Sequence, residues 1–315
     1  MKDKNILIIG AGGQIGTVLL EKLRQIYGSE RVFATDIRAN EEKKIAQIDV
    51  LDTPSLSHFI KSNQIEVIFH LAAILSAKGE QNPKRAWEIN MGGLFNVLEL
   101  AVEHQVKKVF YPSTIAVFGE DIPLNNTPNQ VPLIPSTVYG ISKVAGELWA
   151  KYFFDKHGLD IRSVRYPGVI GYQSLPGGGT TDYAVEIFHA EAKRELFSCF
   201  LSENTTLPMI YMDDCIDATI QLMNAPKENI SIRTSYNLAG VSFSPLELAN
   251  EIQRNNPDFK IEYKPDFRQK IAESWPQSID DSMARKDWGW SPKYGLKELV
   301  EVMMKNVKPF YEKNC

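Results

Sequence analysis

Short apolar runs alternate with longer amphipathic stretches through the first half of the chain. Five runs have the length and composition of buried strands, at residues 5–9, 31–35, 65–70, 106–111 and 161–165. Three stretches repeat their apolar positions at helical spacing, at residues 14–27, 84–104 and 137–157. This alternation predicts an α/β fold with a doubly wound parallel sheet.

The pattern changes after Pro167. Residues 173–181 form a glycine-rich loop, residues 182–196 have a helical pattern, and the tail mixes short helices with turns that contain Pro and Trp. The chain shows no repeat, low-complexity stretch or long linker. We therefore expect a second, smaller domain that packs directly against the first.

The predicted helix at 137–157 has a start signal and a stop signal. Pro135 and Ser136 precede it and supply an N-cap, and Gly158 follows its last residue. Together these signals predict a helix with well-defined ends.

Three glycines join the first predicted strand to the first predicted helix. Glycine lets the strand turn tightly here and lets the backbone approach a pyrophosphate, whose charge lies on free N–H groups at the helix start. A turn without a ligand would show the same spacing, but the strand and helix on either side favour a dinucleotide site. The expected lining is Gly10, Gly13, Gln14, Ile15 and Gly16.

Asp36 ends the second predicted strand, about 20 residues after Gly16. A carboxylate in this place accepts hydrogen bonds from the hydroxyls of the adenosine ribose, and it would repel the 2′-phosphate of NADP. Arg38 follows two residues later, and its positive charge means that NADP is not excluded as the cofactor. The sequence thus predicts NAD as the cofactor.

The length of 315 residues exceeds the size at which one core usually stops growing, so we expect about two domains. Residues 1–167 form the predicted dinucleotide-binding (Rossmann) domain, which the segment 208–240 is expected to rejoin. Residues 168–207 and 241–315 form the predicted smaller domain, which would bind the substrate.

Composition and charge limit which binding partners and which cellular compartment we expect. With a formal net charge of −4 and no basic stripe, the chain is not expected to bind nucleic acid or an anionic membrane. Cys199, Cys215 and Cys315 are odd in number and far apart, which argues against a disulfide framework and fits a reducing compartment. No signal peptide or membrane span is visible. We expect a cytoplasmic protein.

Tyr139 and Lys143 lie four residues apart in the predicted helix at 137–157 and therefore share a face. A free tyrosine has a pKa near ~10 and is a poor base at neutral pH, but a neighbouring cation lowers that pKa and favours the phenolate. Tyr139 is therefore a candidate general base. The spacing alone is common on helix surfaces, and it gains weight from the dinucleotide fold in the same chain.

Ser113 and Thr114 follow the predicted strand at 106–111 directly. The carboxyl end of that strand lies at the sheet edge where ligands bind in such folds. Their hydroxyls are therefore candidates to hold a substrate oxygen.

Segments spread over the whole chain resemble the extended short-chain dehydrogenase/reductases, a family that includes sugar-nucleotide epimerases. Within it the chain is most similar to the short-chain-type L-threonine 3-dehydrogenases. Seven segments carry the resemblance, at residues 75–80, 112–119, 165–168, 179–188, 207–212, 266–268 and 271–276. The functional positions show no clear departure from the family pattern.

This resemblance implies an enzyme that uses NAD to oxidise the 3-hydroxyl of L-threonine to 2-amino-3-oxobutyrate. The product then loses carbon dioxide to give aminoacetone, or a partner 2-amino-3-oxobutyrate CoA lyase cleaves it. In this reaction Tyr139 would take the hydroxyl proton and Lys143 would hold the nicotinamide ribose. Ser113 and Thr114 would position the substrate oxygen.

The resemblance also extends the cofactor site beyond the glycine loop. Two sets of residues are implied, Asp49 and Val50 at the adenine and Leu71, Ala72 and Ala73 along the cofactor. Asn90 and Tyr166 would complete the shell. Each of these cofactor residues also has a plain explanation in packing or capping, and for Asn90 and Tyr166 the two explanations have equal weight.

A homodimer is a further implication. The family's usual dimer surface would lie on the predicted helices at 84–104 and 137–157, although their apolar faces could equally be core.

The loop at 177–181 is the expected site of the substrate carboxylate. Three glycines lead into a helix there, where exposed N–H groups and the helix dipole favour an anion. The expected contacts are Gly179, Thr180 and Thr181, although either threonine could simply cap the helix. Ser76 is a further candidate, and Trp275 would close over the substrate or belong to the core of the tail.

Three alternative functions share parts of this pattern. A UDP-sugar 4-epimerase would share the glycine loop and Tyr139, but Leu207 and Pro208 stand where such enzymes usually carry an Arg-Asp pair that meets the diphosphate. A non-catalytic NAD-sensing regulator would need no base. A zinc alcohol dehydrogenase is disfavoured because the cysteines and histidines show no ligand spacing, so we expect no metal site.

Overall fold

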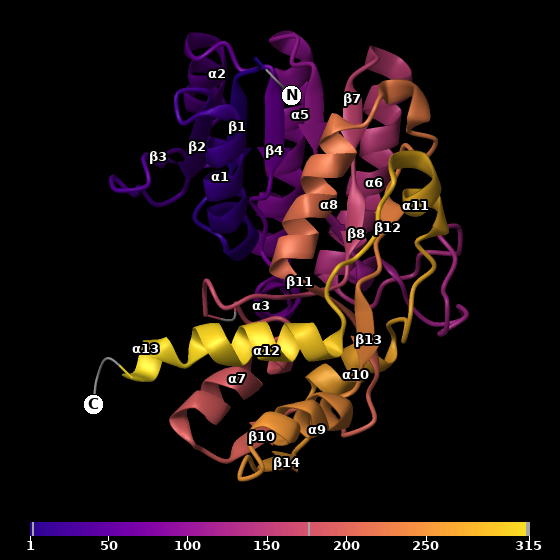
Figure 1. Ribbon diagram of the computed structural model, residues 1–315. Coiled ribbons are helices and arrows are strands. Elements are labelled where there is room, and N and C mark those ends of the chain that lie inside the picture. Colours follow the sequence, from indigo (N-terminus) through magenta and orange to yellow (C-terminus); the bar gives the residue numbers. More distant parts are fainter. Residues whose placement is uncertain (2, 176, 313–315) are drawn as a thin grey trace.

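The chain folds around a six-stranded parallel sheet, seen in a computed structural model that describes residues 1, 3–175 and 177–312 (Figure 1). The strand order is β3-β2-β1-β4-β5-β7, so the chain starts in the middle and winds out to both edges. The strands are β1 (Ile6–Ile9), β2 (Val32–Asp36), β3 (Ala46–Gln47), β4 (Val67–His70), β5 (Lys108–Phe110) and β7 (Asp160–Arg162). This order confirms the predicted doubly wound sheet.

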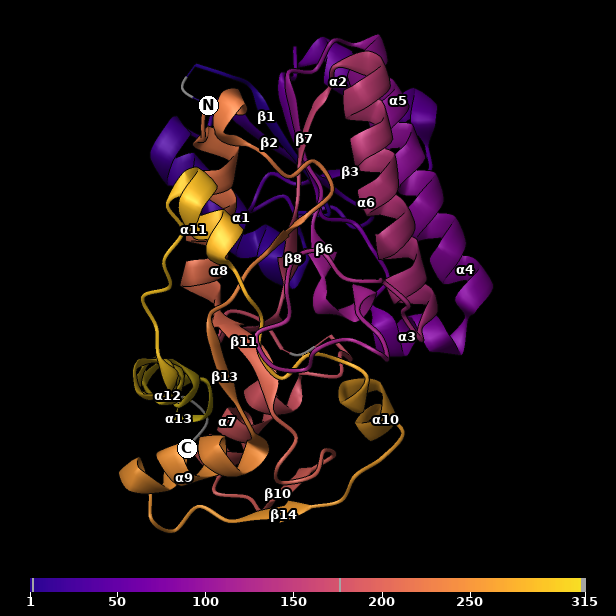
Figure 2. The ribbon, with the colours of Figure 1, turned by 90° about the vertical axis from the view of Figure 1, so that its right-hand side faces the viewer.

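Helices cover both faces of this sheet, and Figure 2 shows the two layers with the sheet edge-on between them. One layer contains α1 (Gln14–Tyr27), α8 (Met212–Asn224) and α11 (Ser282–Trp288). The other contains α2 (Thr53–Ser62), α5 (Gly93–Glu103) and α6 (Val138–His157). Each layer packs apolar side chains against one face, so the sheet lies between two hydrophobic cores.

A second part of the molecule lies beyond the carboxyl ends of the strands (Figure 1). It has a sheet of order β13-β11-β9, a pair of strands β10 and β14, and helices around a third core. Its strands are β9 (Gly168–Ile170), β10 (Phe197–Cys199), β11 (Leu207–Tyr211), β13 (Val241–Phe243) and β14 (Ile261–Tyr263). Its helices are α7 (Tyr183–Lys193), α9 (Pro245–Asn255), α10 (Arg268–Glu273), α12 (Leu296–Val307) and α13 (Pro309–Glu312).

The remaining elements connect these two parts. A small parallel sheet has the order β12-β8-β6. Its strands are β6 (Ser113–Thr114), β8 (Val164–Tyr166) and β12 (Tyr236–Asn237). The helices of this region are α3 (Ser76–Gln81), α4 (Pro83–Trp87), the π-helix Glu88–Gly92 and the 3₁₀ turns Ile115–Val117 and Lys227–Asn229.

Two predicted strands are divided between the main sheet and this small sheet. The strand expected over 106–111 ends at Phe110, and the chain resumes pairing at Ser113 after Pro112, which has no N–H to donate to a ladder. The unbroken strand expected over 161–165 is wrong, because the chain leaves the main sheet at Ser163. The Ser163 hydroxyl lies 2.8 Å from that of Ser235, which anchors this change of sheet.

The single helix expected over 84–104 is also divided. It consists of α4, the π-helix and α5. Asn90 lies in the wider turn of the π-helix. Its side chain makes two hydrogen bonds to the backbone of Ile74: it accepts from the N–H at 2.8 Å and donates to the carbonyl at 3.1 Å. Gly93 begins α5 where a Cβ would lie 2.8 Å from the Val50 side chain, so close packing favours glycine there.

The division into domains stays a prediction. The third core contains Ile115 and Phe118 from the predicted dinucleotide domain together with Tyr183 and Leu299 from the predicted smaller one. The two parts therefore share apolar packing across the proposed boundary.

The buried thiols of Cys199 and Cys215 are free, and Cys315 lies outside the described residues. Across residues 1, 3–175 and 177–312, we find no helix with the length and hydrophobicity that a bilayer crossing needs.

Helix α6 begins one residue later than its predicted N-cap implies. Thr137, not Ser136, caps it, because the Thr137 side chain accepts a hydrogen bond from the N–H of Gly140 at 3.1 Å. At the other end Gly158 has a φ of 70°, as predicted for a C-terminal glycine.

Replacing Thr137 with Ala should lower the free energy of unfolding by about 1 kcal/mol, because the Gly140 N–H loses its acceptor. Urea denaturation measures this change. Ser136→Ala is the matched control, since Ser136 is exposed and should change stability by less than about 0.5 kcal/mol. Equal losses in the two variants would contradict the assignment of the cap.

Candidate active site

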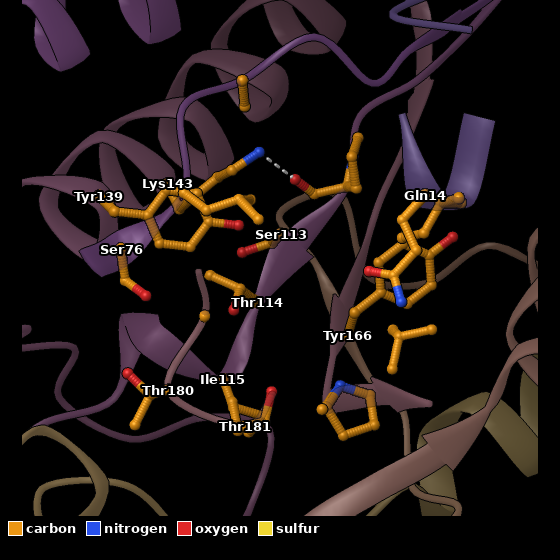
Figure 3. A pocket seen from close by; sticks show the side chains of 18 of the residues that line it. Gln14, Ser76, Ser113, Thr114, Ile115, Tyr139, Lys143, Tyr166, Thr180 and Thr181 are labelled. Carbon is orange, nitrogen blue, oxygen red and sulfur yellow. Dashed lines mark hydrogen bonds between the residues drawn. The ribbon is translucent and has the colours of Figure 1, made fainter. Parts of the chain in front are cut away.

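A pocket of about 240 Å³ opens at the carboxyl edge of the main sheet (Figure 3). Seventeen residues singled out from the sequence line it: Gly10, Gly13, Gln14, Ile15, Gly16, Leu71, Ala73, Ser76, Ser113, Thr114, Tyr139, Lys143, Tyr166, Gly179, Thr180, Thr181 and Trp275. Sequence reasoning missed other parts of the wall, among them Pro112, Ile115 and Asp182. The fold therefore brings the predicted cofactor, catalytic and substrate residues around one space.

The glycine loop has the shape of a cradle for a dinucleotide. Gly10 has a φ of +84°, and a Cβ there would lie 2.6 Å from the backbone nitrogen of Ala72. Gly13 is the N-cap residue of α1 and makes no side-chain hydrogen bond to the first turn, so the helix start is open to an anion. Ala72 thus supports the loop from behind without lining the pocket.

Asp36 lies beside the loop, outside the pocket wall. Its carboxylate accepts hydrogen bonds from the N–H groups of Gly12, at 2.9 Å, and Arg38, at 3.3 Å. These contacts hold the carboxylate at the end of β2, where a ribose would approach the loop.

Three other predicted cofactor residues also lie outside the wall. Asp49 accepts a hydrogen bond from the N–H of Leu51 at 2.9 Å, and Val50 is buried. The Asn90 side chain is engaged by Ile74 and lies 3.3 Å from the hydroxyl of Ser142. These contacts agree with the packing and capping explanations of the three residues.

Tyr166 lines the pocket with its ring. Its hydroxyl is hydrogen-bonded to Thr219 on α8, and burial raises its pKa well above the usual value. The Tyr166 hydroxyl therefore already has a hydrogen-bond partner within the protein.

Tyr139 and Lys143 extend from α6 into the pocket, as the close view shows (Figure 3). The Lys143 ammonium donates to the carbonyl of Pro112 at 2.7 Å and lies 4.5 Å from the ring centroid of Tyr111. Its distance to the ring centroid of Tyr139 is 5.6 Å. The Pro112 carbonyl, in the loop after β5, thus holds the Lys143 ammonium near the rings of both tyrosines.

The expected lowering of the Tyr139 pKa is wrong for the protein by itself. Burial raises the pKa of Tyr139 to about 12, although a hydrogen bond from Thr114 acts in the opposite direction. Burial also lowers the pKa of Lys143 to about 7, against the attraction of Glu147, which raises it. Removal from water disfavours both charged forms, and this outweighs the attraction between them.

The hydroxyls of Ser113 and Thr114 are both engaged. Ser113 donates to a carboxylate oxygen of Glu147 at 2.6 Å. Thr114 accepts from the N–H of Ala116 at 3.2 Å and hydrogen-bonds Tyr139. Sequence reasoning missed Glu147, although it stands one helical turn beyond the lysine on the same face of α6.

The loop before α7 differs from the expectation for residues 177–181. The carboxylate of Asp182 accepts hydrogen bonds from the N–H groups of Gly178 and Gly179, both at 2.7 Å, so these donors are not free for a substrate anion. Neither neighbouring threonine caps α7, whose N-cap residue is Asp182. Pro176 of this loop lies outside the described residues.

Thr180 lies in the pocket wall on the side of Ser76, away from the Lys143 ammonium (Figure 3). It is 1% exposed, and its hydroxyl has no hydrogen-bond partner. Buried hydroxyls are normally paired, so this one indicates a place for a ligand. Trp275 belongs both to the pocket wall and to the third core, and its closure over the substrate stays a prediction.

No group of three His, Cys, Asp or Glu side chains in the described part of the chain is placed to hold a metal ion.

Comparison with known proteins identifies the family. The NAD dependent epimerase/dehydratase family matches residues 6–239, which include the glycine loop, Tyr139 and Lys143. The chain belongs to this family. The family uses NAD, which confirms the predicted cofactor, and the glycine cradle fits it.

Three proteins similar to this chain show which members of the family it resembles. Bovine mitochondrial L-threonine 3-dehydrogenase is 45% identical over 308 residues, 96% of this chain and 82% of the bovine protein. The holo form of L-threonine dehydrogenase from Cupriavidus necator has a TM-score of 0.94 and 48% identity, covering 96% of this chain and 100% of that one. A monomeric L-threonine 3-dehydrogenase from a metagenome has a TM-score of 0.94 and 46% identity, covering 97% and 99%. These proteins confirm the resemblance drawn from the sequence.

Replacing Asp36 with Ser should reduce the preference for NAD over NADP by about tenfold or more, because a carboxylate that repels the 2′-phosphate is removed. The ratio of kcat/KM with the two cofactors measures it. Arg38→Ala is the control and should lower use of NADP alone. A wild-type enzyme that uses both cofactors equally well would contradict the role of Asp36.

Proposed function

We propose that this protein is an NAD-dependent L-threonine 3-dehydrogenase, which oxidises the 3-hydroxyl of threonine to give 2-amino-3-oxobutyrate. One observation carries the proposal: Tyr139, Lys143 and Thr114 line one small pocket beside the dinucleotide cradle, and Thr180, whose hydroxyl has no partner, lines the same pocket. The likeness to L-threonine dehydrogenases along almost the whole chain supports the substrate.

Tyr139 acts as the general base in this proposal. Thr114 donates a hydrogen bond to its phenolic oxygen, which favours the phenolate. Lys143 supplies a positive charge on the same helical face and is held in place by the Pro112 carbonyl. When bound, NAD⁺ supplies the acceptor for the hydride. Gly10, together with the open start of α1, would hold its pyrophosphate.

Other residues of the cofactor and substrate sites follow the same proposal. Asp36 would hold the adenosine ribose, and the ring of Tyr166 would line the cofactor. Thr180 would donate to the substrate carboxylate, with Thr181 and Ser76 beside it in the wall. Trp275 would cover the substrate from the tail.

The two main alternatives fit less well. A UDP-sugar epimerase needs charge to meet a diphosphate, but Leu207 and Pro208 are buried apolar residues of β11. A non-catalytic NAD sensor gives no reason for a tyrosine supported by Thr114 and Lys143.

The proposal also includes the homodimer, the cytoplasmic location and the partner lyase that were expected from the sequence. On α6, the side chains of Ile141, Leu148 and Tyr152 are exposed, and Trp87 is exposed on α4, which supports a homodimer through these helices. Two buried free thiols fit a reducing cytoplasm. A 2-amino-3-oxobutyrate CoA lyase would consume the unstable product.

The direct test follows NADH formation with L-threonine, and a UDP-hexose is tested separately for epimerisation. Tyr139→Phe should lower kcat by roughly 100-fold or more and leave NAD binding nearly unchanged, because only the proton acceptor is removed. Near-native turnover in this variant would contradict the mechanism. Epimerisation without threonine oxidation would overturn the proposed function.

The pH dependence is a second readout of the same test. Below a pH of about 7, where Lys143 titrates, Tyr139 and Lys143 together hold both protons and cannot accept another. Above it the pair has lost one proton, and its form with a Tyr139 phenolate beside a Lys143 ammonium can act as the base. We therefore expect kcat/KM to rise with pH through this region, by about tenfold per pH unit on its acid side. A flat profile would contradict the pair as the base.

Replacing Thr180 with Val should raise the KM for threonine by about tenfold while keeping or increasing the thermal stability. The hydroxyl is buried without a partner, so its loss costs the free protein nothing and deprives the substrate of a donor. Thr127→Val is the matched control: Thr127 is buried with its hydroxyl bonded to Pro123, so this variant should lose stability and keep its KM. A destabilised Thr180→Val enzyme with normal KM would make Thr180 purely structural.

A further inference from the structure

Three charged or polar side chains form a buried network behind the pocket wall. They are Ser113 on β6, Glu147 on α6 and Arg165 on β8, which are 2%, 1% and 3% exposed. Arg165 holds both carboxylate oxygens of Glu147, with Nε at 2.9 Å from Oε1 and Nη2 at 2.8 Å from Oε2. Its Nη1 donates to the carbonyl of Asn129 at 2.8 Å and to the side chain of Asn237 at 3.1 Å. The carboxylate is therefore fixed in position.

This network determines the direction of the hydrogen bond at Ser113. A carboxylate paired with a guanidinium accepts hydrogen bonds and has none to donate. The single proton of the Ser113 hydroxyl therefore points to Glu147, at 2.6 Å. Ser113 also lines the pocket, so toward a ligand its oxygen presents only lone pairs.

The proposed substrate has two groups that can donate to such an oxygen. Its 3-hydroxyl proton must go to Tyr139 for oxidation to occur. Its ammonium has three protons and no acceptor assigned so far. The expectation that Ser113 positions the substrate oxygen stays a prediction, and Ser113 has no free proton to donate there because its proton goes to Glu147.

We propose that Glu147 is a positioning residue that makes Ser113 the acceptor for the substrate ammonium. The inference rests on the proposed function and deepens it. The carboxylate polarises the hydroxyl of Ser113, and a hydrogen bond from a charged donor to an acceptor in such a chain is stronger than an isolated one. Ser113 and Glu147 therefore select amino alcohols over simple alcohols.

L-2-Aminobutyrate is the probe that separates the two roles of Ser113. It keeps the ammonium and the carboxylate of threonine but lacks the 3-hydroxyl, so NAD⁺-loaded protein binds it without turnover. Ser113→Ala should raise its Kd, measured by titration calorimetry, by about tenfold or more.

Glu147→Gln tests the positioning role. The amide removes the negative charge that polarises the Ser113 hydroxyl, and it offers the Arg165 guanidinium one acceptor in place of two. We expect the Kd for L-2-aminobutyrate to rise by about tenfold or more, with NAD binding unchanged. Asp160→Asn is the matched control, since it breaks a buried pair with Arg162 and Arg233 away from the pocket and should leave this Kd unchanged.

Two results would overturn the inference. An unchanged Kd in Ser113→Ala would show that Ser113 does not meet the ammonium. Equal increases in Glu147→Gln and Asp160→Asn would show that Glu147 acts only through stability. Failure of the proposed function looks different, because then the wild-type enzyme itself does not oxidise threonine.

Discussion

Burial of one face of α6 is the constraint on which the site depends. This face carries Lys143 and Glu147, with the half-buried Tyr139 beside them at the pocket, and removing its two charges from water is costly unless each has a partner. Lys143 is met by the carbonyl of Pro112, and Glu147 is met by the guanidinium of Arg165. The two partners come from different segments, the loop after β5 and the strand β8, and together they fix how the helix docks on the sheet.

These partners exist because the chain leaves the main sheet twice. Pro112 cannot extend the β5 ladder, so its carbonyl turns to Lys143 and the next residue, Ser113, starts a new strand. After β7 the chain leaves the sheet at Ser163, and β8 then pairs beside β6 and brings Arg165 under the helix. The small sheet thus supports the face of α6 that carries Tyr139, Lys143 and Glu147.

Local spacing was sufficient to predict the glycine loop, Tyr139 and Lys143, because a turn and a single helical face each depend on nearby residues. Contacts between distant segments were not predictable in this way. The acceptor for the Ser113 proton comes from a helix and the partner of that acceptor from another strand, so no short segment contains the network. Asp182 is different: it lies next to the predicted loop, but only the folded backbone shows that its carboxylate takes the N–H groups of that loop.

With the proposed roles, three walls of the pocket each recognise a different group on adjacent carbons of the substrate. Tyr139 accepts from the hydroxyl, Ser113 accepts from the ammonium, and Thr180 donates to the carboxylate. Because Asp182 already occupies the loop donors, the carboxylate depends on Thr180, in the pocket wall on the side of Ser76 (Figure 3). Three contacts of different polarity define a handedness, so the same arrangement that places the hydroxyl at the base also discriminates between the stereoisomers of threonine.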